Sequence, residues 1–290
     1  MTESPPSRTV PVVVLSVGGM EPQGGRPTRS LLRAARFVRK ILPLQLVGIL
    51  AIVAIWTAVV VSGLVASRLL PSPAQIVEHI ELLATKGYRG TPLATHVLAS
   101  VERTTIGFSL AVIFGIPVGL AMGRYRVLGA LFGPVLAVLR PIPPIAFIPL
   151  AVLYLGLGEA SKIVLIFLAP FMFIALNAEA GVRSVPSILI RAGQMLGYSP
   201  RQLFTRVIFP GSLPSIMSGV RTGAAVAWAL VVAAELIAAQ EGLGYMVASA
   251  GNFFDIRTVY AGIVIIGLIG FLVDTVARMI EERVLHWRGQ

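Results

Sequence analysis

The chain contains no cysteine and only three histidines among its 290 residues. The lack of cysteine excludes disulfides, thiolate zinc sites and thiol catalysis. The histidines (His79, His96 and His286) lie far apart in the sequence, and no Gly-x-Ser-x-Gly or His-Glu-x-x-His pattern occurs. We therefore expect no catalytic residues and no metal ligands, and the chain is not predicted to be an enzyme.

A phosphate-binding loop of the form Gly-x-x-x-x-Gly-Lys-Ser/Thr is also missing. If ATP drives this protein, a separate polypeptide must bind it, so no cofactor is expected on this chain.

Charged residues are scarce, at 13%, whereas hydrophobic residues make up 56%. The mean hydropathy of +0.85 is that of an integral membrane protein rather than a soluble one. The net charge is +11, from 24 Lys and Arg against 13 Asp and Glu. These basic residues lie between apolar runs, which indicates the positive-inside pattern of a membrane protein, and no nucleic-acid partner is expected.

Six apolar segments are long enough to cross a bilayer of about 30 Å. They cover residues 42–66, 96–122, 128–155, 161–179, 215–239 and 258–280. With both termini in the cytoplasm, only five Lys or Arg residues fall on the outer side, namely Arg68, Lys86, Arg89, Lys162 and Arg257. The sequence therefore predicts an all-α integral membrane protein with six transmembrane helices and both termini cytoplasmic.

The ends of the chain differ in composition from this apolar region. Residues 1–41 are rich in Pro, Gly, Ser and Arg, and their one apolar run, 10–17, is too short to span a membrane. We predict a disordered, basic cytoplasmic leader there, with a signal peptide as the alternative. A transmembrane permease domain at 42–285 and a short cytoplasmic tail at 286–290 complete the predicted organisation.

Several local signals predict structure between and within the spans. Ser72, Pro73 and Gln75 form a capping box that should begin an amphipathic outer helix over 73–85. A periplasmic turn with a short helix is expected over 240–257. Glycines at fourfold spacing, Gly115, Gly119 and Gly123, should allow close helix packing in the second span.

The loop at 184–212 is polar and basic between two apolar spans, and it predicts two short helices. Gly197 should end the first helix in a left-handed conformation. Ser199, Pro200 and Gln202 should then start the second with a capping box. The second helix is expected to stop before Pro210.

Ionisable residues at membrane depth are costly and are candidates for a function. Glu102 and Arg103 are adjacent and could neutralise each other or reach the interface. Asp274 and Arg278 are one turn apart and predict an i,i+4 pair.

The candidates for the translocation path lie in the third and fifth spans. Arg140 precedes the prolines that should break the third span, and it would suit an anionic substrate or snorkel to the interface. Glu235 could line the path, close its outer end or form a structural pair. The complete set of path candidates is Arg140, Pro143, Pro144, Trp228 and Glu235.

The loop carries a resemblance to a known family. Ala192, Gly197, Val207, Phe209 and Pro210 stand at the spacing of the permease signature of bacterial ABC importers: Glu-Ala-Ala, three residues, Gly, nine residues, Ile-x-Leu-Pro. In that family the loop is the coupling helix, which docks on a cytoplasmic ATPase subunit. This resemblance implies ATPase contacts from Arg191, Ala192, Gly193, Gly197, Tyr198, Ser199, Pro200, Arg201, Phe204 and Pro210. The chain departs from the signature at Arg191, where Glu is usual, and at Gly193, where Ala is usual.

Other stretches extend the resemblance to most of the chain. Residues 114–119, 140–144, 156–162, 232–239 and 242–244 are similar to the nitrate, sulfonate and taurine importer permeases, and the stretches 190–192 and 234–239 most resemble the taurine permeases. The family implies a type I importer permease (MetI-like) fold in the bacterial inner membrane. It also implies a permease homodimer, two ATPase subunits that bind ATP and magnesium, and a periplasmic substrate-binding protein.

The resemblance implies import of taurine or an alkanesulfonate by alternating access. Nitrate, bicarbonate or another small organic solute is the alternative substrate. Alternatives from other classes are an ion-coupled secondary transporter, which would need inverted repeats that we do not find, and a membrane scaffold or enzyme subunit. Neither explains the loop at 184–212.

Overall fold

The computed structural model describes residues 47–48, 50–66 and 68–287. The predicted leader at 1–41 and residues 288–290 of the predicted tail lie outside these residues. The chain divides into two compact units, Met1–Ile55 and Trp56–Gln290. An apolar helix, Leu50–Val61, begins in the first unit. The elements and contacts that follow belong to the second unit.

The regular secondary structure of the described residues of the second unit is helical, with no strand and one isolated bridge between Tyr88 and Thr91. The helices are α2 (Pro73–Lys86), α3 (Leu93–Arg124), α4 (Arg126–Leu139), η1 (Pro144–Phe147), α5 (Ile148–Leu155), α6 (Glu159–Ser184), α7 (Ser187–Met195), α8 (Pro200–Leu203), η2 (Phe204–Ile208), α9 (Phe209–Ala238), α10 (Leu243–Asn252) and α11 (Ile256–Val284). The predicted outer helix corresponds to α2 with its capping box, and the predicted short helix in 240–257 corresponds to α10.

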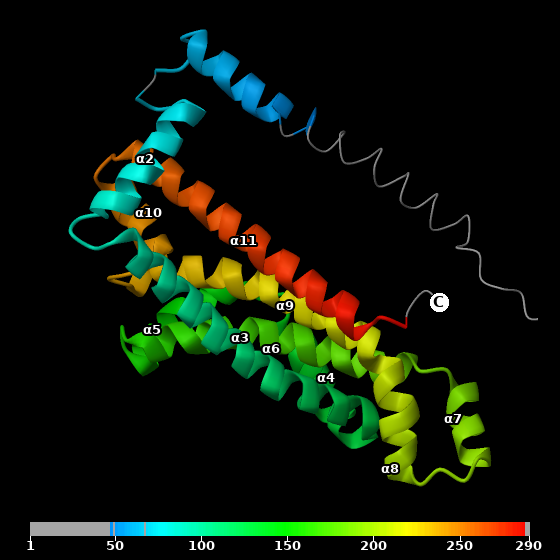
Figure 1. The fold of residues 1–290 in the computed structure, drawn as a ribbon. Coiled ribbons are helices and arrows are strands. Elements are labelled where there is room, and N and C mark those ends of the chain that lie inside the picture. The colour runs from blue at the N-terminus through cyan, green and yellow to red at the C-terminus, as the bar shows by residue number, and fades with distance from the viewer. Residues whose placement is uncertain (1–46, 49, 67, 288–290) are drawn as a thin grey trace, which may run out of the picture. The chain divides into compact units, whose positions relative to one another are not determined.

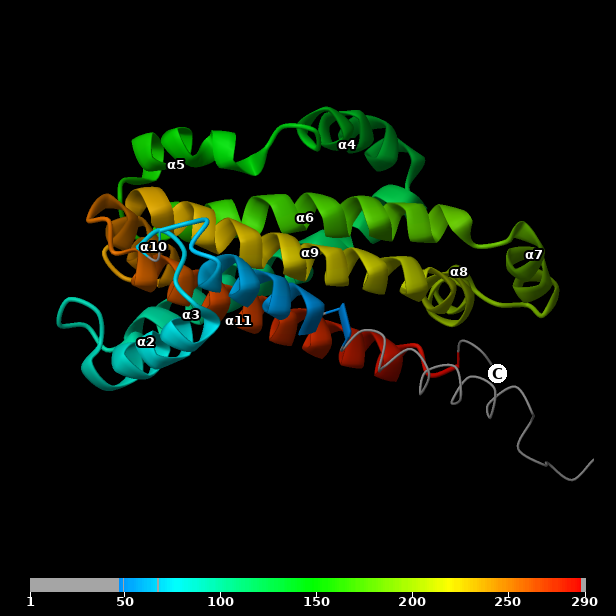
Figure 2. The same cartoon turned by 90° about the horizontal axis from the view of Figure 1, so that it is seen from above.

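The long helices α3, α6 and α9 form the packed centre, with α6 in contact with both others (Figures 1 and 2). Glycines on α3 allow this packing. A Cβ at Gly115 would lie 3.0 Å from Ile174 Cγ2 of α6, and one at Gly119 would collide with the Ala175 backbone. Close approach through small residues, predicted from their fourfold spacing, is therefore confirmed.

Four helical runs are long and apolar enough to cross a membrane: α3, α6, the continuous run Pro200–Ile237, and α11. The pair formed by 126–139 and 144–155 makes a fifth if it is counted as one span. The all-α, multi-pass fold is confirmed. The first predicted span, 42–66, lies partly outside the described residues, so the count of six stays a prediction.

The third predicted span is broken where its prolines lie. Helix α4 ends at Leu139, and the direction of the chain turns by 93° before α5. Pro141, Pro143 and Pro144 cause this break, because a proline in a helix interior removes a hydrogen bond and collides with the preceding turn. By contrast, Pro170 lies inside α6, which is longer than the predicted 161–179.

Candidate functional site

The loop between α6 and α9 folds as two short helices joined by a tight turn. Helix α7 ends at Met195, and Gly197 follows two residues later at φ +76°. The Tyr198 N–H donates to the Gly193 carbonyl at 3.1 Å. The left-handed glycine is thus confirmed. A Cβ at Gly197 would meet nothing within 4 Å, so the backbone conformation alone requires glycine there.

The second short helix starts with the predicted capping box. The Gln202 N–H donates to Ser199 Oγ at 3.3 Å, and the Ser199 N–H donates to Gln202 Oε1 at 2.9 Å. Pro200 follows the cap as the first residue of α8. These bonds satisfy donors that a helix start leaves unpaired and fix the direction of α8 relative to the turn.

The prediction that this helix stops before Pro210 is wrong. Residues Phe204–Ile208 form one π-helical turn, and the Phe209 N–H donates to the Phe204 carbonyl. The helix then continues as α9 through Pro210. In a regular α-helix the proline ring would collide with the carbonyl four residues earlier. The wider π turn redirects that part of the hydrogen-bond ladder, so the chain passes through Pro210 without ending the helix.

One face of this element packs on the transmembrane helices. Leu203 and Ile208 are buried in a cluster with Val182 of α6. Gly193 lies against the same side, where a Cβ would come within 2.8 Å of Leu203 Cδ1 and 3.3 Å of Tyr198 Cδ2. This contact explains why glycine stands where the signature usually has alanine.

The opposite face is open. Met195 and Leu196 are 87% and 72% exposed, and Ile188 is 68% exposed. The basic side chains Arg191 and Arg201 are exposed on the same element. An apolar surface with basic residues around it is the composition expected of a docking surface for another protein.

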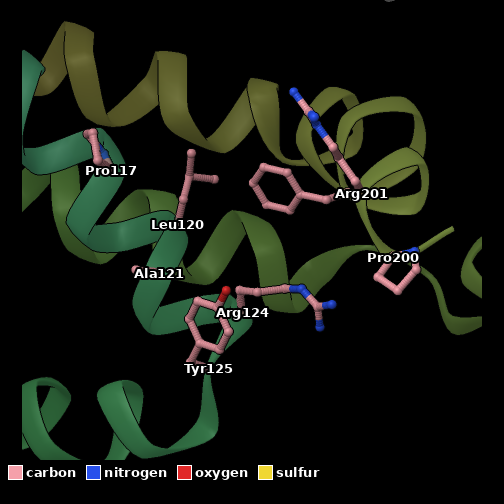
Figure 3. A pocket seen from close by; sticks show the side chains of 8 residues that line it. Pro117, Leu120, Ala121, Arg124, Tyr125, Pro200 and Arg201 are labelled. Atoms are coloured by element: carbon pink, nitrogen blue, oxygen red, sulfur yellow. The ribbon is translucent and has the colours of Figure 1, made fainter.

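A cavity of about 490 Å³ lies between α8 and the end of α3. Figure 3 shows Arg124 extending from α3 toward Pro200, next to Tyr125. Phe204 and Leu120 line the same cavity, so the short helices and α3 meet at this point.

The five path candidates lie in different environments. Arg140 is exposed near the ring of Phe173, at 5.6 Å from guanidinium carbon to centroid, and Pro143 is exposed in the break. Pro144 is half-buried. Trp228, by contrast, is buried in the main core and donates from Nε1 to the Ile266 carbonyl at 3.1 Å.

Glu235 is 1% exposed, and its carboxylate holds three elements together. It accepts hydrogen bonds from Ser100 Oγ at 2.8 Å, from Arg103 Nη1 at 2.7 Å and from the Gly244 N–H at 2.9 Å. A Cβ at Gly242 would collide with this carboxylate. Glu235 therefore forms the structural pair that was one of its three predicted roles. The two others, lining the path and closing its outer end, stay predictions.

Arg103 does not pair with Glu102, which is exposed. Besides Glu235, Arg103 contacts Glu159 of α6 through two bonds of 2.6 and 2.9 Å and donates to the Glu241 carbonyl at 2.8 Å. Lys162 adds a further bond to Glu159 at 2.8 Å. Of the two predicted alternatives, mutual neutralisation of Glu102 and Arg103 is wrong, because adjacent residues in a helix point in different directions. The other, that these residues reach the interface, stays a prediction. The sequence contains one signal for this network, because charged residues fall at the same ends of three predicted spans.

Two further charged groups lie on the long helices. The predicted pair of Asp274 and Arg278 is confirmed at 2.8 Å, and Arg221 of α9 joins it through a 3.1 Å contact to Asp274. Glu179 of α6, which is not among the residues predicted from the sequence, pairs with Arg183 at 2.7 Å.

Comparisons with known proteins show the family and the fold of this chain. A family model described as "Binding-protein-dependent transport system inner membrane component" matches residues 111–286. The taurine transport system permease protein TauC of Escherichia coli is 43% identical over 246 residues, which cover 84% of this chain and 90% of TauC. The nitrate import permease protein NrtB of Synechocystis is 29% identical, covering 93% of this chain and 97% of NrtB. A solved inward-facing structure of the MetNI methionine ABC transporter has a similar fold, with a TM-score of 0.57 at 21% identity over 66% of this chain and 95% of that chain.

Proposed function

Because this chain belongs to the family of binding-protein-dependent transport system inner membrane components, we propose that it imports taurine or a closely related sulfonate. It is a multi-pass permease of the inner membrane. The observation that supports the substrate is the similarity to TauC over nearly the whole of both chains. Nitrate is the second candidate, because NrtB is similar over an even larger share of this chain.

In this proposal the element at 187–208 couples transport to ATP hydrolysis on a separate subunit. Its exposed apolar residues, Met195 and Leu196, would enter the ATPase surface, and Arg191 and Arg201 would contact it at the edge. Leu203 and Ile208 hold the element against α6. The helix is also continuous from Pro200 to Ile237, so a displacement of α8 moves α9 directly.

The complete transporter in this proposal has two copies of this chain, two ATPase subunits and a periplasmic binding protein. ATP and magnesium bind to the ATPase subunits. The break at Arg140, Pro143 and Pro144 borders the path, while Trp228 and Glu235 hold the surrounding helices in place. The binding protein would select the solute, and closure of the ATPases would switch the permease between inward- and outward-facing states.

The complex purified in lipid nanodiscs with its ATPase tests the proposal. ATPase activity would be measured with binding protein loaded in turn with taurine, longer alkanesulfonates and nitrate. We expect stimulation by the taurine-loaded protein. Stimulation by the nitrate-loaded protein alone would identify nitrate as the substrate and leave the proposed importer class in place. Solute uptake that needs an ion gradient and no ATP would contradict the importer itself.

The coupling role has its own test. Leu196→Glu places a charge on the exposed apolar surface, and we expect the ATPase subunit to be lost from the complex during affinity purification. Leu69→Glu is the matched control, because Leu69 is similarly exposed in the turn that precedes α2, away from α7 and α8. Equal recovery of the ATPase with both variants would contradict docking through α7.

A further inference from the structure

A cavity of about 850 Å³ lies between α3, α4 and α6. Helix α4 lies over α6 here (Figure 2), and small residues on α4 leave the space open. Gly129 and Gly133 line it together with Ala130, Pro134 and Ala137. The volume lies within the range of roughly 300–1,000 Å³ of small-molecule sites.

The cavity contains charges of both signs. Glu179 is buried in its wall, and its one ion-pair partner among the residues that the structure describes is Arg183. The side chain of Arg183 is 60% exposed and bonds to Oε1 of Glu179. Arg126 lines the cavity from the start of α4, and in the described part of the chain it has no ion pair. A carboxylate can accept several hydrogen bonds, so Glu179 retains the capacity for another donor.

The charged group around Glu235, at the other end of the long helices, differs from the group around Glu179. There Glu235 is enclosed by Ser100, Arg103 and Gly244, and Arg103 is shared with Glu159. Glu235 makes its bonds within the protein, as in a structural network. Glu179, at the end of its predicted span, has Arg183 alone as an ion-pair partner among the described residues, and Arg183 lines the same cavity. Ionisable residues of membrane segments that face a cavity commonly mark a substrate path.

We propose that this cavity binds the transported solute, with Glu179 holding an ammonium group and Arg126 an anionic head group such as a sulfonate. The inference rests on the proposed function, since it assumes that the solute is a small aminosulfonate. A carboxylate and a guanidinium in one cavity complement a zwitterion, because each solute charge meets the opposite charge of the protein. The site therefore distinguishes an aminosulfonate from a sulfonate of the same length without the amine.

The test compares two ligands on the purified permease–ATPase complex in nanodiscs, without the binding protein. Direct binding of radiolabelled taurine and its displacement by 1-propanesulfonate, which has a methyl group in place of the amine, would be measured. Glu179→Gln should weaken taurine binding by roughly tenfold and leave 1-propanesulfonate within about twofold. Arg126→Gln should weaken both ligands by a similar factor. Glu282→Gln, at an exposed position near the end of α11, is the control.

A second variant tests the site without removing a charge. A Cβ at Gly133 would lie 3.9 Å from Glu179 Oε1, an ordinary contact that the fold accommodates. Gly133→Ala thus puts a methyl group beside the carboxylate, and taurine binding should weaken several-fold. Gly267→Ala on α11, where a Cβ meets nothing within 4 Å, is its control and should bind as the wild type does.

The outcomes separate this inference from the function on which it rests. Suppose that the wild-type complex imports taurine and that Glu179→Gln and Gly133→Ala leave taurine binding unchanged. This result would overturn the site and leave the proposed function in place. Equal weakening of both ligands by Glu179→Gln would also overturn the ammonium contact. A wild-type complex that imports no taurine would overturn the substrate and the site together.

Discussion

At the scale of single residues, Arg103 is the clearest case of a side chain whose surroundings determine its role. Its guanidinium connects α3 to α6 through Glu159 and to α9 through Glu235. It also holds the loop before α10 through the Glu241 carbonyl. Removing one partner of a buried ion pair leaves the other charge uncompensated, which costs more than the pair contributes.

We therefore expect Arg103→Ala to lower stability by about 3–5 kcal/mol, because the carboxylate of Glu235 remains buried without its partner. The midpoint of thermal unfolding in detergent would measure the loss. Adding Glu235→Gln to this variant should restore part of it. Arg257→Ala, at an exposed position without an ion pair among the described residues, should change stability by no more than about 0.5 kcal/mol. Equal stability of Arg103→Ala and Arg257→Ala would contradict a structural role for Arg103.

Gly197 determines the shape of the turn between α7 and α8 through its positive φ. Gly197→Val should strain this turn by about 1–3 kcal/mol, because a β-branched residue rarely adopts a left-handed conformation. We expect the complex to hydrolyse ATP without transporting its solute. Parallel measurements of ATPase activity and uptake in liposomes would show this uncoupling.

Gly197→Asn is the matched variant, because asparagine tolerates the left-handed region better than other residues. It should transport as the wild type does. Full transport by Gly197→Val would show that the turn does not need its observed conformation.

At the scale of elements, the π turn at 204–208 sets the direction of α8 relative to α9. One helical residue corresponds to a rotation of about 100° and a rise of 1.5 Å. The extra residue of the π turn therefore decides which face of α8 turns toward α6 and which stays open. Leu203 is buried and Arg201 exposed as a result.

Deletion of Thr205, combined with Pro210→Ala to permit a regular helix, should rotate α8 by about 100° relative to α9. We expect normal membrane insertion and loss of ATPase-coupled uptake. Pro210→Ala alone keeps the number of residues in the π turn and is measured in parallel. Any loss of uptake in this variant comes from Pro210, itself an implied ATPase contact, and is separated from the effect of the deletion. Unchanged uptake after the deletion would show that the direction of α8 is not important for coupling.

At the scale of the whole molecule, the distribution of positive charge predicts which ends of the helices face the cytoplasm. The natural chain has no cysteine, so single introduced cysteines report the side of the membrane without background. Gln194→Cys in α7 and Gln240→Cys before α10 are both exposed positions.

A membrane-impermeant maleimide added to intact spheroplasts should label Gln240→Cys and leave Gln194→Cys unlabelled. We expect nearly complete labelling of Gln240→Cys and almost none of Gln194→Cys, because the reagent does not cross the membrane. Labelling of Gln194→Cys should appear once the cells are opened. The reverse pattern would contradict the predicted orientation and, with it, docking of α7 on a cytoplasmic ATPase.

The sequence by itself determined the membrane class, the all-α fold and the local turns of the loop. Composition shows the class directly, and a cap or a left-handed glycine depends on residues within one helical turn. Gly197, the capping box at Ser199 and the break after Leu139 could be predicted for this reason. The coupling signature could be identified because its residues are close in the sequence.

Only the tertiary structure decided which charges pair and which face a cavity. Glu159 and Glu235 are 56 and 132 residues from Arg103, so no local pattern could connect them. The cavity beside Glu179 likewise exists because α4 packs over α6 with small residues between them. The π turn that precedes Pro210 could not be predicted either, because residue preferences near a proline indicate a helix end and not a π turn. These features depend on which helices meet, and helix packing is set by contacts between distant parts of the chain.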